Sequence, residues 1–233
     1  MFAFIESALV FLAGLLVRLA LMALVVAVFA IPILFALKAW GGFTALRRRA
    51  HGVVEVAGLP WRSGLRYARS HTWLAGTGDA VRVGLDGLAQ RLLGEVRQVV
   101  LPPLGLEVHE GEVVAALGID GRRAPIVSPI SGRVTAVNEK LRSDPSRTSR
   151  DPYLSGWLYS VAPVDRRWEE LPSGAPARQW FRGEAERLHR LLEGHLGLAA
   201  ADGGEFLLPP ASSLPDAEWL AAVEAFLKPA TTG

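Results

Sequence analysis

The sequence predicts a mainly β domain with one internal helix, preceded by an N-terminal transmembrane helix and followed by a helical extension. Three observations support this fold class. A long apolar run comes first, strand-sized segments rich in β-branched residues follow it, and two stretches with helical spacing lie near the C-terminus. The predicted division is a transmembrane anchor at 1–40, a linker at 41–69, the β domain at 70–165 and the helical extension at 166–233.

The anchor is predicted from residues 8–37, which are apolar except for Arg18. The stretch Leu19–Leu37 holds 19 residues without a charge, close to the roughly 20 that cross a bilayer as a helix. Arg18 can snorkel to the headgroups, or it can face a partner helix or a lipid phosphate. The run therefore predicts a protein with a single membrane span.

Basic residues just after the apolar run predict its orientation. A cleaved signal peptide carries its basic residues before the apolar region instead. Positive flanks stay on the cytoplasmic side, so we expect the inner membrane as the location, with the soluble domain in the cytoplasm. The residues assigned to the membrane and its flank are Arg18, Lys38, Arg47, Arg48 and Arg49.

Composition and motifs exclude several classes of function. The chain has no cysteine, which excludes disulfides, thiolate zinc sites and a cysteine nucleophile. From residue 50 onward 22 acidic residues face 20 basic ones, so no nucleic-acid partner is expected. No Ser/His/Asp set, phosphate-binding loop or dinucleotide fingerprint occurs. We therefore predict a protein that is not an enzyme and holds no metal.

The β domain is predicted to begin with a strand at Ala80–Val83 and a helix at Gly84–Val96. The apolar residues of that helix share one face, and Asp86 suits its N-cap. Asp120–Gly121 predicts a hairpin, because a type I′ turn needs positive φ at both central residues. The remaining predicted strands are Val99–Leu101, Leu106–Val108, Val113–Ile119, Ala124–Ile126, Gly132–Val137 and Tyr153–Ala162.

The extension is predicted to hold helices at Ala177–Leu192 and Asp216–Leu227. Trp180 and Phe181 belong to the apolar face of the first helix. That face either packs on the β domain or forms a docking face for another subunit. His71, which lies beside another aromatic residue, is expected to pack at the entrance of the domain.

Several motifs between His71 and Asp165 resemble the H protein of the glycine cleavage system, a lipoyl-carrier family. The matching segments are His71–Trp73, Val81–Gln90, Leu93–Val96, Leu101–Pro102, Gly105, Glu110–Glu112, the Ser-Pro-x-Ser-Gly sequence at Ser128–Gly132, Val137–Glu139, Asp151–Tyr153 and Gly156–Leu158. The resemblance implies a flattened barrel or sandwich of two small antiparallel sheets, the biotinyl/lipoyl-carrier fold.

The attachment residue departs from the family pattern. In the family, a lysine at the tip of a hairpin carries the lipoyl group, and counting ten residues on from Gly111 gives Gly121 at that position. Of the three lysines, Lys38 is in the anchor flank, Lys228 is in the tail and Lys140 is well past the hairpin. Arginine stays protonated and cannot replace the lysine amine. We therefore expect neither a lipoyl group nor any other cofactor.

The function predicted from these observations is that of a membrane-tethered structural or adaptor subunit of a larger membrane complex. Its non-lipoylated H-protein-like domain would dock other protein subunits. The candidate docking residues are Asp120, Gly121, Arg122, Arg123, Trp180 and Phe181. Two alternatives are a group carrier that works without the usual lysine and an exporter-type membrane adaptor.

Overall fold

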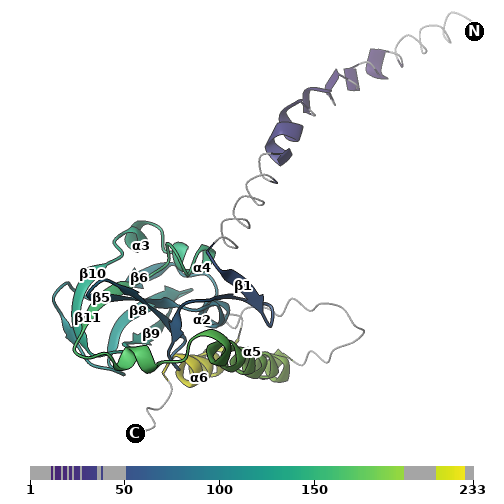
Figure 1. The fold of residues 1–233 in the computed structure, drawn as a ribbon. Coiled ribbons are helices and arrows are strands. Elements are labelled where there is room, and N and C mark those ends of the chain that lie inside the picture. The colour runs from purple at the N-terminus through teal and green to yellow at the C-terminus, as the bar shows by residue number, and fades with distance from the viewer. Residues whose placement is uncertain are drawn as a thin grey trace, which may run out of the picture. The chain divides into compact units, whose positions relative to one another are not determined.

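The computed structural model describes residues 51–196 and 214–228, together with part of the segment from 12 to 38. In that segment the described residues are 12, 14–16, 18, 19, 21, 22, 24–26, 28–35 and 38. The chain divides into two compact units, Met1–His51 and Gly52–Gly233, and each is described by itself. The second unit is mainly β, as predicted (Figure 1).

A six-stranded antiparallel sheet forms the larger β layer of the second unit. Its strands, in sheet order, are β3 (Arg66–Tyr67), β4 (Thr72–Thr77), β5 (Ala80–Leu85), β11 (Tyr159–Pro163), β10 (Gly132–Val137) and β7 (Glu107–Val108). Buried and exposed residues alternate along the first four positions of β10, which is the pattern of a sheet with one face in the core.

A three-stranded antiparallel sheet supplies the second layer. It is ordered β6 (Gln98–Val100), β8 (Val113–Ile119) and β9 (Arg122–Val127). Leu117 and Ile126 of this sheet join Val83 and Val161 of the larger sheet in one apolar core. The predicted strands at 113–119 and 132–137 match the structure residue for residue.

Helix α2 (Gly87–Leu93) begins at the predicted N-cap. Oδ1 of Asp86 accepts hydrogen bonds from the amides of Leu88 at 3.0 Å and Ala89 at 2.9 Å. The helix was predicted to start at Gly84, but that residue belongs to β5, where it pairs with Trp73 of β4. A Cβ at position 84 would lie 2.4 Å from the Trp73 ring, so the close approach of that ring requires glycine there.

The strand predicted at Tyr153–Ala162 is half wrong. Only Tyr159–Pro163 is β structure, because the Tyr153 side chain turns inward. Its hydroxyl donates to the carbonyl oxygen of Pro60 at 2.7 Å and accepts from the amide of Gly87 at 3.0 Å. A buried tyrosine hydroxyl needs such partners, and a ladder position would not supply them.

Some elements were not predicted at all. The range assigned to the linker contains the hairpin β1 (Val53–Val56) and β2 (Leu59–Arg62), which pair antiparallel, and also β3. Two short helices, α3 (Lys140–Ser143) and α4 (Arg147–Arg150), and the 3₁₀ turn η1 (Arg167–Glu170) complete the β domain. The division of the chain into four parts stays a prediction.

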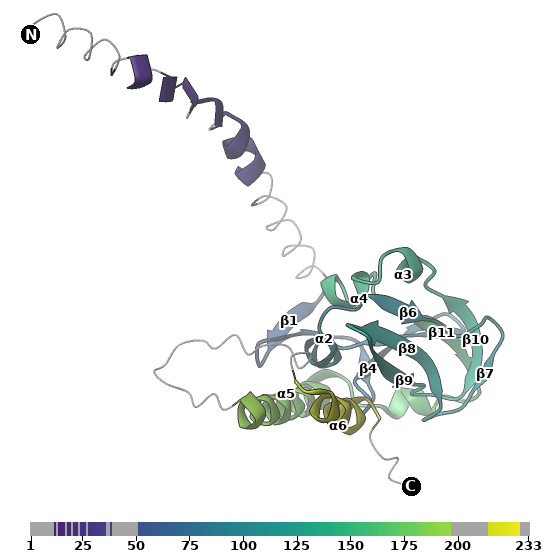
Figure 2. The same cartoon turned by 180° about the vertical axis from the view of Figure 1, so that it is seen from behind.

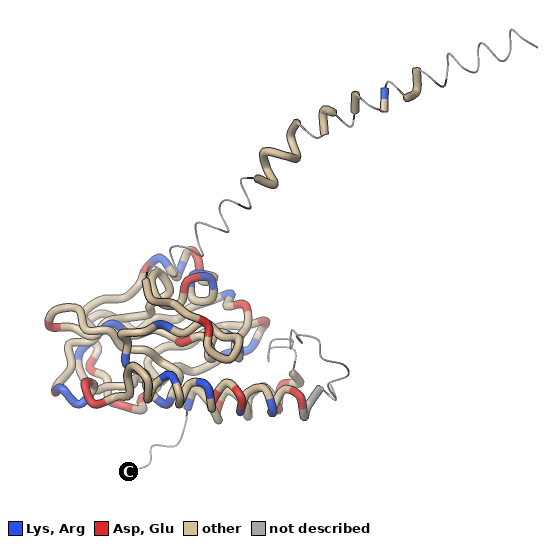
Figure 3. The backbone as a smooth tube through the Cα atoms, turned by 45° about the vertical axis from the view of Figure 1, so that its right-hand side comes forward, with Lys and Arg blue, Asp and Glu red and all other residues tan. Residues whose placement is uncertain are grey.

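Two helices of the predicted extension lie side by side on the β domain (Figures 1 and 2). Helix α5 (Gly174–Leu196) contacts α2, β1 and β3, and helix α6 (Asp216–Leu227) contacts α2 and β9. Both basic and acidic residues are distributed along α5 (Figure 3). Its buried stripe is Ala177, Phe181, Ala185, Leu188 and Leu192, the spacing of one helix face.

The first unit does not bear out the predicted anchor. Its described residues are helical, and Arg18 and Lys38 are exposed among them. Arg47, Arg48 and Arg49 lie outside the described residues. The predicted inner-membrane location with a single span is wrong: among the described residues, no helix is long and apolar enough to cross a membrane.

Candidate partner-binding site

The β8–β9 hairpin carries the first candidate site at its tip. Ile119 pairs with Arg122, and the two residues between them have positive φ, +46° at Asp120 and +83° at Gly121. These values confirm the predicted type I′ turn. A Cβ at Gly121 would have no atom within 4 Å, so the tip faces open space.

The charged residues of the tip differ in their surroundings. Asp120 is exposed, and its Oδ1 lies 3.9 Å from Nε of Arg97. Arg123 is exposed on β9. Arg122 is different: its side chain is 24% exposed and pairs with Asp216 of α6, Nη2 to Oδ1, at 2.7 Å. The Arg122 guanidinium also lies over the Trp219 ring at 5.4 Å. Helix α6 therefore already covers one of the predicted docking residues.

The two aromatic candidates on α5 pack inside the chain. Phe181 is fully buried in the core. Trp180 is half-buried and stacks on His71, with ring centroids 5.0 Å apart. A partner could reach Phe181 only by displacing the chain's own core. The structure therefore uses this face for packing on the β domain, and it does not bring the two rings to the hairpin tip.

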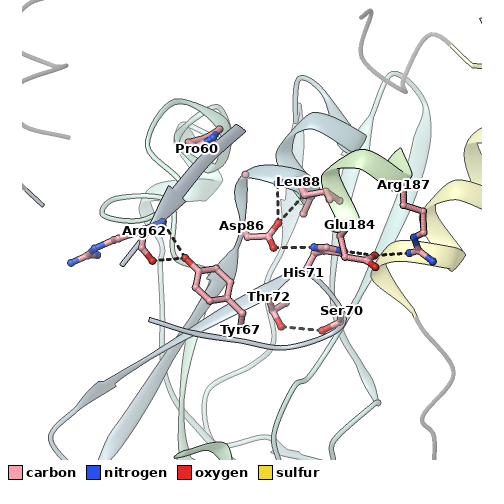
Figure 4. Close-up of polar contacts among 12 residues, drawn as sticks. Pro60, Arg62, Tyr67, Ser70, His71, Thr72, Asp86, Leu88, Glu184 and Arg187 are labelled. Carbon is pink, nitrogen blue, oxygen red and sulfur yellow. Dashed lines mark hydrogen bonds and ion pairs between the residues drawn. The ribbon is translucent and has the colours of Figure 1, made fainter. Parts of the chain in front are cut away.

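His71 lies at the centre of a polar cluster that also includes Asp86, Glu184 and Arg187 (Figure 4). His71 and Asp86 are fully buried, whereas the side chain of Arg187 is half exposed. Nδ1 of His71 is 2.9 Å from Oδ2 of Asp86, and Nε2 is 3.5 Å from Oε2 of Glu184. Glu184 pairs in turn with Nη2 of Arg187 at 2.8 Å. The His71 backbone has φ +54°, a conformation that costs a β-carbon-bearing residue roughly 1 kcal/mol. The cluster joins the β domain to α5.

The two carboxylates control the charge of the His71 ring. Burial by itself lowers the pKa of His71, but Asp86 and Glu184 outweigh it, so the pKa is raised above its ordinary value of 6.5. The contact with the His71 ring at 3.5 Å, followed by the charge of Arg187, lowers the pKa of Glu184 against the opposing effect of burial. Both shifts favour the charged forms. The ion pairs of the cluster involve no serine, threonine or lysine nucleophile, and it acts as an ionic joint with a buried centre.

The expected packing role of His71 is what the structure shows, but its carboxylate partners were missed. Asp86 was recognised only as a helix cap, and it serves both roles with different oxygens. Glu184 is far away in the sequence, and no local pattern points to it. The hydrophobic period of α5 shows which face is buried, but not that a carboxylate on its border meets a histidine.

Comparisons with known proteins agree with this fold. Residues 65–182 match the family model described as glycine cleavage H-protein. The chain is 42% identical to the glycine cleavage system H protein of Hydrogenovibrio crunogenus over 105 residues, which is 44% of this chain and 81% of that relative. It is 36% identical to the corresponding protein of an Anaeromyxobacter species over 122 residues, 52% of this chain and 95% of that relative.

A solved structure also matches. The crystal structure of a glycine cleavage system H protein from Mycobacterium marinum is 30% identical, covers 53% of this chain and 99% of that chain, and has a TM-score of 0.46. Members of the family carry a lipoyl group between other proteins and do not catalyse a reaction, which confirms the prediction that this protein is not an enzyme. With half of its residues matched by the family model, this chain belongs to the glycine cleavage H-protein family.

Proposed function

We propose that this protein is a non-enzymatic adaptor that uses its H-protein domain to dock another protein and carries no lipoyl group. The membrane tether is not part of the proposal. The partners to test first are the other proteins of the glycine cleavage system, because H proteins interact with them. The docking surface is the β8–β9 hairpin, where the family's cofactor arm is attached.

The composition of the hairpin supports the proposal most directly. No lysine lies between Val113 and Val127, and the tip is Asp120–Gly121. Lipoylation forms an amide with a lysine amine, and the arginines that follow the tip stay protonated. Lys140 is exposed on α3 and Lys228 follows α6, so the described lysines near the β domain lie on other elements than this hairpin.

A lipoylation assay tests the missing arm. The purified chain is incubated with lipoate, ATP and a lipoate–protein ligase, with the H. crunogenus H protein as the positive control. We expect the mass of the control to rise by one lipoyl group and the mass of this chain to stay unchanged. A lipoylated wild-type chain would overturn the proposal.

A binding assay tests the docking surface. The full chain is titrated against each purified glycine cleavage enzyme. Arg123→Glu reverses an exposed charge on β9 near the tip, and Arg133→Glu makes the same change on β10, where the side chain is 63% exposed. We expect the first variant to weaken binding and the second to leave it unchanged. Equal effects of the two variants would remove the hairpin as the docking surface.

A second candidate function is that of a group carrier acting without the usual lysine, and the names of the relatives favour it. In that case the wild-type chain gains the mass of a lipoyl group, mapped to Lys140, and Lys140→Arg abolishes the gain. The same mass measurement therefore separates the two functions.

A further inference from the structure

Helix α6 covers the face on which the hairpin stands. It contacts β9, the second strand of the hairpin, and α2 beneath it, and Figure 2 shows it beside α5 on this side of the β domain. Two interactions reach the hairpin itself: the ion pair between Arg122 and Asp216 at 2.7 Å, and the Arg122 guanidinium over Trp219 at 5.4 Å. The helix therefore occupies the base of the surface that we propose for docking.

The chemistry of α6 shows what this surface accepts. Its first turn is acidic, with Asp216 and Glu218, and an indole lies three residues after the first carboxylate. The residues of α6 that are buried against the β domain are Trp219, Ala222, Val223, Phe226 and Leu227. Arg122 and Arg123 give the hairpin a positive charge that complements the acidic turn. The surface is thus built for an acidic amphipathic helix that begins with a carboxylate and a tryptophan.

Helix α6 is an addition to the family domain. The family match ends at residue 182, whereas the helix begins at Asp216. The matched residues make up 95% of the Anaeromyxobacter relative, so that relative has almost no length left for such a helix. The family match includes the hairpin, α2 and the start of α5, but not α6. Helix α6 therefore covers a surface that belongs to the family domain.

The helix depends on its docking. A helix of this length is marginal on its own in water, and its N-cap, Pro215, makes no side-chain hydrogen bond. Nε1 of Trp219 is buried without a hydrogen-bond partner, which weakens the docked state. Its docking rests on the burial of Trp219, Val223 and Phe226, so a charge placed on that face should release the helix locally without global unfolding.

We propose that α6 is an internal competitor for the partner, which binds the same face of β9 and α2 through an acidic, tryptophan-containing helix. This inference rests on the proposed docking function and adds its regulation. While α6 is docked, the partner helix is excluded. Binding therefore requires release of α6, and any change that loosens α6 increases the affinity for the partner.

The test uses a labelled peptide with the sequence of residues 214–228 and the full-length chain. Val223→Asp places a charge on the buried face of α6, and Leu220→Asp places it on the outer face, where Leu220 is 49% exposed. We expect the Val223→Asp chain to bind the peptide about tenfold or more tightly than the wild type, because a linked helix competes at high effective concentration. The Leu220→Asp chain should bind it as weakly as the wild type.

Specificity is read from a second peptide, in which Asp216→Lys removes the pairing with Arg122. We expect it to bind the Val223→Asp chain about two- to fivefold more weakly, because an exposed ion pair contributes little to binding. Hydrogen exchange on the Val223→Asp chain should show protection lost in α6 and kept in β8 and β9.

Three outcomes would overturn the inference: equal peptide binding by the wild-type and Val223→Asp chains, no binding by either chain, or loss of protection through the whole β domain. The peptide assay contains no partner protein. Its failure therefore leaves the docking function standing, whereas failure of the enzyme titration overturns docking regardless of the peptide.

Discussion

The hairpin tip and the His71 cluster are opposites within one domain. At the tip, Asp120 and Arg123 are exposed, and Gly121 faces open space. In the cluster, the side chains of His71 and Asp86 are completely buried, and their ring and carboxylate are 2.9 Å apart. The tip is defined by backbone conformation alone, whereas the cluster is defined by charges removed from water.

The two regions therefore differ in how much they contribute to the stability of the domain. A buried charge is expensive unless it is paired, so the cluster can hold α5 on the β domain but tolerates little change. An exposed turn needs only residues that accept positive φ, so its side chains are free to serve a partner. We therefore expect mutations to divide in the same way, with large stability effects at the cluster and small ones at the tip.

The largest effect is expected for His71→Ala. It leaves Asp86 buried without its cationic partner, and breaking a buried ion pair costs about 3–5 kcal/mol. The measurement is the free energy of unfolding from urea denaturation. His71→Asn is the control, because asparagine tolerates positive φ and can donate to Asp86, and it should cost distinctly less. A loss below about 1 kcal/mol for His71→Ala would show that the cluster is not a joint.

The next effect is a pH dependence of stability. Because the folded pKa of His71 is raised, its contribution is fully present below the unfolded pKa and is lost as pH rises through the folded pKa. The pKa of Glu184 is lowered, so its contribution is lost as pH falls through that value. We expect the free energy of unfolding to decline as the pH rises through the pKa of folded His71. The total decline is about 1.4 kcal/mol for each pH unit by which the folded-state pKa exceeds the unfolded-state pKa.

The same titration of the His71→Asn variant is the control for this dependence. The charged groups around His71 are Asp86 and Glu184, with Arg187 paired to Glu184, and histidine is the side chain whose charge ordinarily changes near neutral pH. The alkaline decline should therefore disappear in the variant. An unchanged decline would assign the dependence to other groups.

A smaller effect is expected for Gly121→Ala at the tip. Its φ of +83° is strained for alanine, at a cost of about 1–2 kcal/mol, but the added methyl group meets no other atom. Gly58→Ala is the matched control: Gly58 also has positive φ, +74°, and open space around its Cβ position. Urea denaturation should give the same loss for both. A much larger loss at Gly121 would mean that the tip is packed against something.

The tip was largely predictable from the sequence, and the cluster was not. Asp120–Gly121 between two β-rich segments specifies its own turn, since few residues accept positive φ in succession. Asp86 likewise specifies a helix start, and Asp216–Leu227 has the exact bounds predicted for α6. These are local features, in which the residues that cause the structure are neighbours in the chain.

The failures involve contacts between distant residues. His71 and Glu184 come from opposite ends of the domain, and Tyr153 left its predicted strand to reach Pro60 and Gly87. The β1–β2 hairpin had a local sequence signal in Gly58, which follows the apolar segment Val53–Val56, but the other glycines nearby favoured a linker. In the structure both Ala57 and Gly58 have positive φ.

The smallest effect on stability is expected for Arg123→Glu, and it sharpens the contrast most. Arg123 is exposed on β9, and surface substitutions of this kind change the free energy of unfolding by about 0.5 kcal/mol or less. Arg133→Glu, the control on β10, places a carboxylate opposite Glu107, so it should cost somewhat more stability, up to about 1 kcal/mol. Binding to a glycine cleavage enzyme should separate the two, since only Arg123 lies beside the hairpin tip. If Arg123→Glu unfolds the domain, the tip is a structural element like the His71 cluster. If the variant changes neither stability nor binding, the partner binds another surface of the domain. Only loss of binding at unchanged stability fits a surface kept free for recognition.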